Sequence, residues 1–192
     1  GYPCGTFSPA RRFDGGPLPL RGTNSKDIWG LPHLVGKERA RVNSANKLLL
    51  RMHELMKDCG SYGVPFYLEN PQSSKLWMHP IIRKWVQHKT SHKVEFDYCQ
   101  FGTAWKKATA ILSVGNPKFH TGKLVKCKVT WQGKDSICSK SGKPHVTLTG
   151  FIGGAEKGQY KTNKACPYPY EFCTYVAKLI AEPTPTKRLN DH

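Results

Sequence analysis

Apolar residues recur every three or four positions along Glu38–Asp58, which predicts a long amphipathic helix. Its apolar stripe includes Val42, Leu49 and Met56, and Gly60 follows as a C-terminal stop. Beyond the helix, short apolar runs alternate with turn residues, as strands and short helices do. The further predicted elements are a strand over Val64–Leu68, a helix over Pro80–His88, a strand over Lys93–Tyr98, a turn over Gln100–Gly102 and a strand over Ala108–Val114.

This order of elements is typical of the second half of a doubly wound sheet, so we expect an α/β fold with a partial, Rossmann-like sheet. We expect that half-domain to span residues 1–118. Residues 119–181 predict a small, basic, β-rich appendage with strands over Lys123–Trp131 and Lys143–Phe151, and residues 182–192 a tail.

The charge of the chain points to a polyanionic partner. The 192 residues include 30 Lys and Arg but only 13 Asp and Glu, which gives a net charge of +17. Such an excess of positive charge favours nucleic acid, DNA or RNA, as the partner. Any single lysine run is also consistent with a solvated surface. The basic stretches are spread along the chain, as in a protein packed into RNA. No apolar run of membrane-spanning length occurs in the sequence. The candidate nucleic-acid contacts are Arg11, Arg12, Gln100, Lys106 and Lys107.

The seven cysteines predict metal binding or burial rather than disulfides. The chain opens without a secretory signal pattern, so we expect a reducing, intracellular location. Thiolates and imidazole in such a compartment favour tetrahedral zinc. The predicted structural zinc site uses Cys127, Cys138, His145 and Cys173, with Cys166 as the substitute fourth ligand. The alternative is a small β core of buried cysteines with a surface histidine.

Two further motifs indicate a particular type of reaction. Cys4 lies on a Gly/Pro turn, and Glu69 and Asn70 end an apolar run. A thiolate and a carboxylic acid together can add to a pyrimidine ring and protonate it. The alternatives are a buried structural thiol at Cys4 and a strand-end cap at Glu69.

The order of these motifs resembles the DNA cytosine-5 methyltransferase family, in its divergent phage and mobile-element members. The resemblance covers roughly residues 1–115 and includes Glu69-Asn70-Pro71 followed by Leu76-Trp77. It implies that Cys4 attacks C6 of a flipped-out cytosine, that Glu69 holds and protonates the ring, and that Asn70 orients the loop. The family also carries two arginines near the base. Here that stretch offers Lys106 and Lys107 instead, and Thr109 cannot replace a guanidinium.

The resemblance leaves out the half that binds S-adenosylmethionine, since no Gly-x-Gly-x-x-Gly turn occurs in this sequence. We therefore expect the cofactor only if a second polypeptide or an N-terminal segment completes the fold, and whether the chain is an enzyme stays open. The leading hypothesis is the target-base half of a cytosine-5 methyltransferase-like protein. One rival is a non-catalytic, RNA-binding structural subunit of a large ribonucleoprotein, such as a ribosome. Another is a DNA-binding piece of a mobile-element polyprotein.

Overall fold

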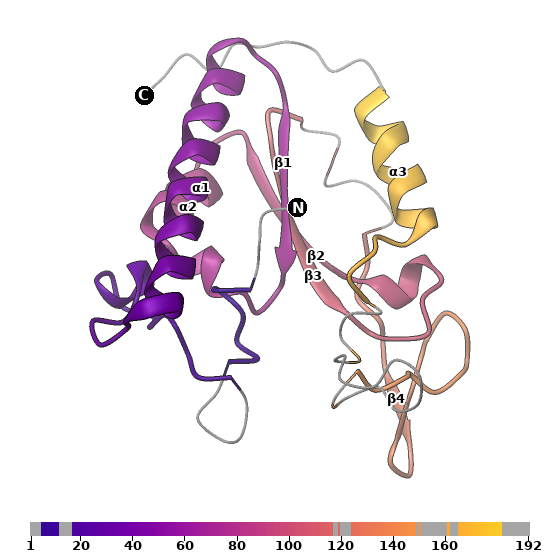
Figure 1. Cartoon of the computed structure of the whole chain (residues 1–192). Helices are drawn as coiled ribbons and strands as arrows, with labels where there is room; N and C mark the ends of the chain where they lie inside the picture. The colour runs from indigo at the N-terminus through magenta and orange to yellow at the C-terminus, as the bar shows by residue number, and fades with distance from the viewer. Residues whose placement is uncertain are drawn as a thin grey trace. The chain divides into compact units, whose positions relative to one another are not determined.

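In the computed structural model the chain forms two compact units (Figure 1). The first unit comprises Gly1–Val94, Ala110–Thr121 and Thr184–His192, and the second Glu95–Thr109 and Gly122–Pro183. The residues that the structure describes are 5–11, 17–116, 119, 124–148, 150, 161 and 165–181.

The first unit is a mixed helix-and-sheet structure. A three-stranded sheet has the order β1-β3-β2, so β1 is an edge strand among the described strands. The N–H of Gly115, just after β3, donates to the carbonyl of Thr90, just before β2 (3.2 Å), so these two strands are antiparallel. The elements are η1 (Asp27–Trp29), α1 (Gly36–Ser61), β1 (Phe66–Pro71), η2 (Lys75–Met78), α2 (Pro80–Val86), β2 (Ser91–Asp97) and β3 (Ala108–Val114), with β2 and β3 running on into the second unit.

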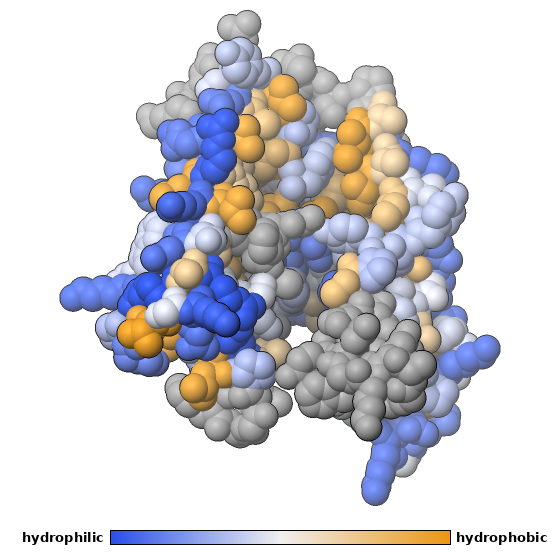
Figure 2. Space-filling model, viewed as in Figure 1, coloured by the Kyte–Doolittle hydropathy of each residue, from blue (hydrophilic) through white to orange (hydrophobic). Residues whose placement is uncertain are grey.

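The core of the first unit forms where α1 and α2 meet the sheet. Both helices lie on the same side of the strands (Figure 1). The apolar stripe of α1 buries Leu49 against Leu68 of β1 and Leu112 of β3. Its other face keeps Leu48 and Leu55 half exposed, at 49% each, and Figure 2 shows hydrophobic side chains among the hydrophilic ones along this helix. The described helices include none long and apolar enough to cross a membrane.

The second unit contains η3 (Tyr98–Phe101), the antiparallel pair β4 (Thr130–Gln132) and β5 (Asp135–Ile137), and α3 (Tyr170–Ala181). The two-residue turn between β4 and β5 starts at Gly133, whose φ of +60° suits a tight hairpin. Phe172 of α3 anchors that helix by stacking on Phe96, with ring centroids 5.2 Å apart, and by meeting Phe101 edge to face at 5.3 Å.

The expected mixture of helix and sheet is confirmed, and the two-unit division differs from the predicted boundary at residue 118. Glu95–Thr109 belongs with the second unit because η3 packs on α3 there. Within the predicted appendage, the regular strands of the described residues are β4 and β5. Lys143–Phe151 forms a single bridge, at Pro144, among its described residues.

A buried histidine gives the first unit a predicted pH dependence. His79 is fully buried, its Nδ1 accepts the N–H of Ile81 at the start of α2, and its Nε2 has no hydrogen-bond partner among the described residues. Burial, followed by the charge of Arg21, lowers the pKa of His79 from 6.5 to about 4. Because the unfolded chain binds this proton more readily, stability is complete above pH 6.5 and is lost as the pH falls toward 4.

We expect the free energy of unfolding to drop by about 2 kcal/mol between pH 7 and pH 5 on this account. Urea unfolding at the two pH values measures it. His79→Asn keeps an oxygen to cap α2 and should reduce the pH dependence by that amount. An equal pH dependence in the variant would contradict the assignment.

Candidate functional site

Four metal-ligating side chains converge in the second unit. They are Cys99 of η3, Cys127 before β4, Cys138 directly after β5, and His145. Their ligand atoms all lie within 4.8 Å of one another. The three cysteines are buried and the histidine is half-buried, so the group is shielded from solvent on most sides.

The spacing of the ligand atoms fits one tetrahedral ion. The Sγ atoms of Cys127 and Cys138 are 4.0 Å apart, and Cys127 Sγ is 3.8 Å from Nε2 of His145. Tetrahedral zinc, with bonds of about 2.3 Å to sulfur and about 2.1 Å to nitrogen, separates its ligand atoms by about 3.6–3.8 Å. A disulfide would need sulfurs about 2.05 Å apart, and these cysteines are free thiols.

The histidine is held with the correct nitrogen toward the cysteines. Nδ1 of His145 lies 3.2 Å from the hydroxyl of Ser136, and its backbone N–H donates to the Ser136 carbonyl at 2.8 Å. Nε2 is thereby left to face Cys127. A second hydrogen bond that fixes the ring in this way is the usual support of a metal-ligating imidazole.

The backbone after Cys138 wraps around its sulfur. Burial alone would raise the pKa of this thiol, but hydrogen bonds from the backbone of Ser141 and Lys140 outweigh it and lower the pKa to about 6. Gly142 closes the turn with a φ of +67° and donates its N–H to the Cys138 carbonyl at 2.9 Å. By contrast, burial raises the pKa of Cys99 to about 12, so this thiol needs a cation beside it to become a ligand.

The donor set defines what the group can do. Three sulfurs and one imidazole can hold a soft or borderline ion such as zinc, whereas magnesium and calcium prefer oxygen ligands. Four protein ligands leave no position for water or substrate, which is the arrangement of a structural rather than a catalytic ion.

Three of the four sequence-predicted ligands come together, and the fourth does not. Cys173 lies exposed on α3 and is not part of the group, nor is the exposed Cys166. Cys99 takes that place. It was missed because it lies far upstream of the other three, in a turn that the sequence associates with the sheet.

The two motifs of the predicted catalytic pair lie in the first unit. Cys4 itself lies outside the described residues. The turn that follows it is described: the carbonyl of Phe7 accepts the N–H of Lys75 (3.0 Å), five residues beyond Asn70. Phe7 is fully buried in the same core cluster as Leu68 of β1 and Leu76 of η2. The segment after Cys4 is therefore fastened to the segment after Glu69.

The end of β1 presents polar groups at this place. Glu69 is half-buried, and Asn70 is 1% exposed. The side-chain oxygen of Asn70 has no hydrogen-bond partner within the described structure. A buried acceptor of this kind gains stability from an incoming donor.

A pocket of about 370 Å³ opens beside the turn after Cys4. It carries one charged side chain, Arg41, from the first half of α1. The residues that line it are Gly5, Thr6, Ala40, Arg41, Ser44, Ala45 and Leu48.

The buried side chain of Arg21 stabilises the turn after Cys4. Its side chain is 1% exposed and its guanidinium lies 3.8 Å from the centroid of the Phe7 ring. It donates to the hydroxyl of Thr6 (3.2 Å), the carbonyl of Ile28 (2.7 Å) and the amide oxygen of Asn46 (2.8 Å). This role could not be predicted from the sequence, because an arginine in a Gly/Pro-rich stretch resembles any basic loop residue.

The residues predicted to contact nucleic acid have different surroundings in the structure. Arg11 donates to the carbonyls of Gly5 (3.1 Å) and Leu18 (2.8 Å), and Arg12 lies outside the described residues. Lys107 donates to the Ala165 carbonyl at 3.0 Å, with its ammonium 4.8 Å from the centroid of the Tyr98 ring.

Lys106 and Gln100 complete that set. The ammonium of Lys106 lies 3.9 Å from the carboxylate of the buried Asp97, whereas Gln100 is half-buried beside the metal ligands. The three basic residues thus contact other parts of the protein: Arg11, Lys106 and Lys107. Gln100 donates a hydrogen bond to Cys99 of the Cys/His group.

Comparisons with known proteins returned nothing: no protein-family model, no curated protein and no solved structure matches this chain.

Proposed function

We propose that the chain is the target-base half of a DNA cytosine-5 methyltransferase-like protein. The observation that carries this proposal is the hydrogen bond from Lys75 to Phe7, together with the burial of Phe7 beside β1. Two motifs far apart in the sequence, at Cys4 and at Glu69, are thereby joined through their flanking segments.

In this proposal the Cys4 thiolate forms a bond to C6 of a cytosine that has left the base stack. Glu69 donates a proton to the ring, so that the negative charge that arrives with the sulfur does not accumulate there. The pocket beside the turn, with Arg41 on its wall, offers room for the extruded nucleotide and charge for its phosphate. The addition reverses when the C6–S bond breaks and the ring returns its proton to Glu69, which restores both the cytosine and the Cys4 thiolate.

S-adenosylmethionine would supply the methyl group, but the pocket beside the Cys4 turn does not fit it. That pocket has no acidic side chain to hold a ribose, and no Gly-x-Gly-x-x-Gly turn occurs in the sequence. The residues present therefore support base handling alone.

A completing segment has a place to bind on β1. This strand is at the edge of the described sheet, and an edge strand offers backbone groups to a further strand. An apolar pocket of about 160 Å³ lies beside it, lined by residues such as Met52, Leu55 and Phe66. We propose that a second polypeptide or further segment adds a strand here.

In this proposal the Cys/His group has a structural role, which is to stabilise the second unit. We propose that it holds zinc, which ties η3 to the β4–β5 hairpin. Because the unit has few regular strands of its own, an ion is an effective way to fix its loops.

The test is a covalent adduct rather than methyl transfer. An oligonucleotide with 2-pyrimidinone in place of cytosine is a better electrophile at C6, so a thiolate that adds to it leaves a lasting bond. We expect intact-mass spectrometry to find this adduct with the chain, or with a longer product of the same gene that contains it. Cys4→Ser should abolish the adduct and Glu69→Gln should slow it by about 10²–10⁴-fold.

Cys59→Ser is the matched control, since Cys59 is a half-buried thiol of the first unit that the proposal gives no role. It should leave the adduct unchanged. Tight binding of structured RNA with no adduct in any arm would overturn the enzyme proposal and favour the rival RNA-binding structural subunit.

A further inference from the structure

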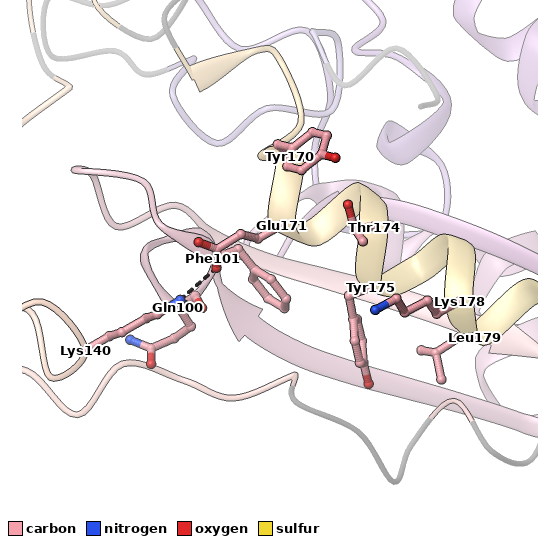
Figure 3. A pocket seen from close by; sticks show the side chains of 9 residues that line it. All are labelled: Gln100, Phe101, Lys140, Tyr170, Glu171, Thr174, Tyr175, Lys178 and Leu179. Carbon is pink, nitrogen blue, oxygen red and sulfur yellow. Dashed lines mark hydrogen bonds and ion pairs between the residues drawn. The ribbon is translucent and has the colours of Figure 1, made fainter.

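A further pocket lies in the second unit. Its volume is about 490 Å³, and η3, the turn after Cys138 and α3 form its walls (Figure 3). The residues that line it are Gln100, Phe101, Lys140, Tyr170, Glu171, Thr174, Tyr175, Lys178 and Leu179.

One wall is built by the metal-binding turns. Gln100 directly follows Cys99, and its side-chain amide donates to Cys99 Sγ (3.5 Å) and to the hydroxyl of Ser139 (3.4 Å). Lys140 comes two residues after Cys138 and donates to the backbone carbonyl of Gln100 at 2.9 Å. An ion held by Cys99 and Cys138 therefore also fixes Gln100 and Lys140.

The other wall is α3. Tyr170, Thr174 and Lys178 recur at every fourth position and so share one side of the helix. Lys178 extends along the helix toward the ring of Tyr175 (Figure 3). The helix is anchored from behind by the buried Phe172, so this wall is a fixed surface.

The chemistry of the pocket suits a nucleotide. Tyr170 is 84% exposed, and Phe101 and Tyr175 add further aromatic surface, with ring centroids 5.9 Å apart. Glu171 forms an ion pair with Lys140 at 2.8 Å, so its charge is balanced, and no described residue forms an ion pair with Lys178. Aromatic faces beside a lysine bind the bases and phosphates of single strands, whose bases are free to stack on protein.

We propose that this pocket binds an unstacked nucleotide of single-stranded nucleic acid, and that the metal centre keeps it in shape. A base stacks on Tyr170, the amide oxygen of Gln100 accepts a hydrogen bond from the base edge, and Lys178 binds the neighbouring phosphate. Duplexes bind less well because each base must first leave its stack. This site does not depend on Cys4 or Glu69, so it stands or falls separately from the proposed enzyme activity.

The experiment uses the metal-loaded chain and fluorescence anisotropy. Its probes are a single-stranded DNA 12-mer, an RNA of the same sequence, a duplex, and an abasic strand with the same phosphates. We expect Tyr170→Ala to weaken binding of the single strands about tenfold and to leave the abasic strand unaffected. Lys178→Gln should lower the salt dependence by about one ion. A preference between DNA and RNA tells which strand the pocket takes.

Tyr62→Ala is the matched control. Tyr62 is 80% exposed, just after α1 in the first unit, and its loss should change affinity less than twofold. Removal of the metal with a chelator should weaken single-strand binding at least as much as Tyr170→Ala does. The proposal would be overturned if Tyr170→Ala and Tyr62→Ala reduced single-strand affinity equally. It would also be overturned if Tyr170→Ala weakened binding of the abasic strand as much as binding of the intact strand. An unchanged affinity in the metal-free chain would overturn it as well.

Discussion

Cys99→Ser is expected to release the metal ion and to free the β4–β5 hairpin from η3, while the aromatic contacts of α3 remain. The four ligands are the main tie between η3 and the β4–β5 hairpin, and the buried cluster there consists of the cysteines themselves, with Val129 packed against it. Structural zinc contributes about 10–16 kcal/mol to the folding of small peptides, more than such a core supplies. Metal analysis of the purified variant and hydrogen exchange across Glu95–Thr109 measure the two effects.

Cys173→Ser is the control that decides the fourth ligand. Cys173 is exposed on α3, outside the group, so its variant should keep one ion per chain and normal protection. Cobalt substitution adds a spectroscopic readout, since tetrahedral cobalt bound to three thiolates absorbs differently from cobalt bound to two. The assignment is wrong if the Cys173 variant loses the ion and the Cys99 variant keeps it.

Arg21→Met is expected to destabilise the first unit by about 2–4 kcal/mol. The change leaves the buried acceptors at Thr6 and Ile28 and the half-buried acceptor at Asn46 without their donor. Each loss at a buried acceptor costs about 1–3 kcal/mol, offset in part because a buried charge is removed. It also removes the guanidinium from the Phe7 ring. Urea unfolding followed by tryptophan fluorescence gives the difference.

Arg51→Met serves as the comparison, because Arg51 is exposed on α1 and its loss should cost less than about 0.5 kcal/mol. Arg21→Lys keeps the charge but not the planar fork, so it should fall between the two. If Arg21→Met is as stable as Arg51→Met, the guanidinium does not hold the turn after Cys4.

Much of the first unit could be predicted from the sequence because its signals are local. The apolar stripe of α1 and the apolar run of β3 have the period of the element they form, and β3 spans the predicted residues Ala108–Val114. Three members of the Cys/His group could be predicted for the same reason: Cys127 and His145 are only 18 residues apart, with Cys138 between them.

The remaining features depend on contacts between distant residues. Nothing near Cys99 marks it as a ligand until η3 meets the hairpin. No helix was predicted over Tyr170–Ala181, since aromatic and β-branched residues such as Tyr170, Phe172 and Val176 favour strands locally. Burial of Phe172 against η3 overrides that preference. Arg21 is likewise recognisable only once Phe7 and Asn46 surround it.

The uneven spacing of the four ligands has a consequence for how the second unit assembles. Three of them belong to one short stretch, so the hairpin alone forms a partial chelate as soon as β4 and β5 pair. Cys99 closes the coordination shell only when η3 arrives from much earlier in the chain. Closing the larger loop costs more chain entropy than closing the smaller one, so we infer that the ion is captured first and enclosed afterwards.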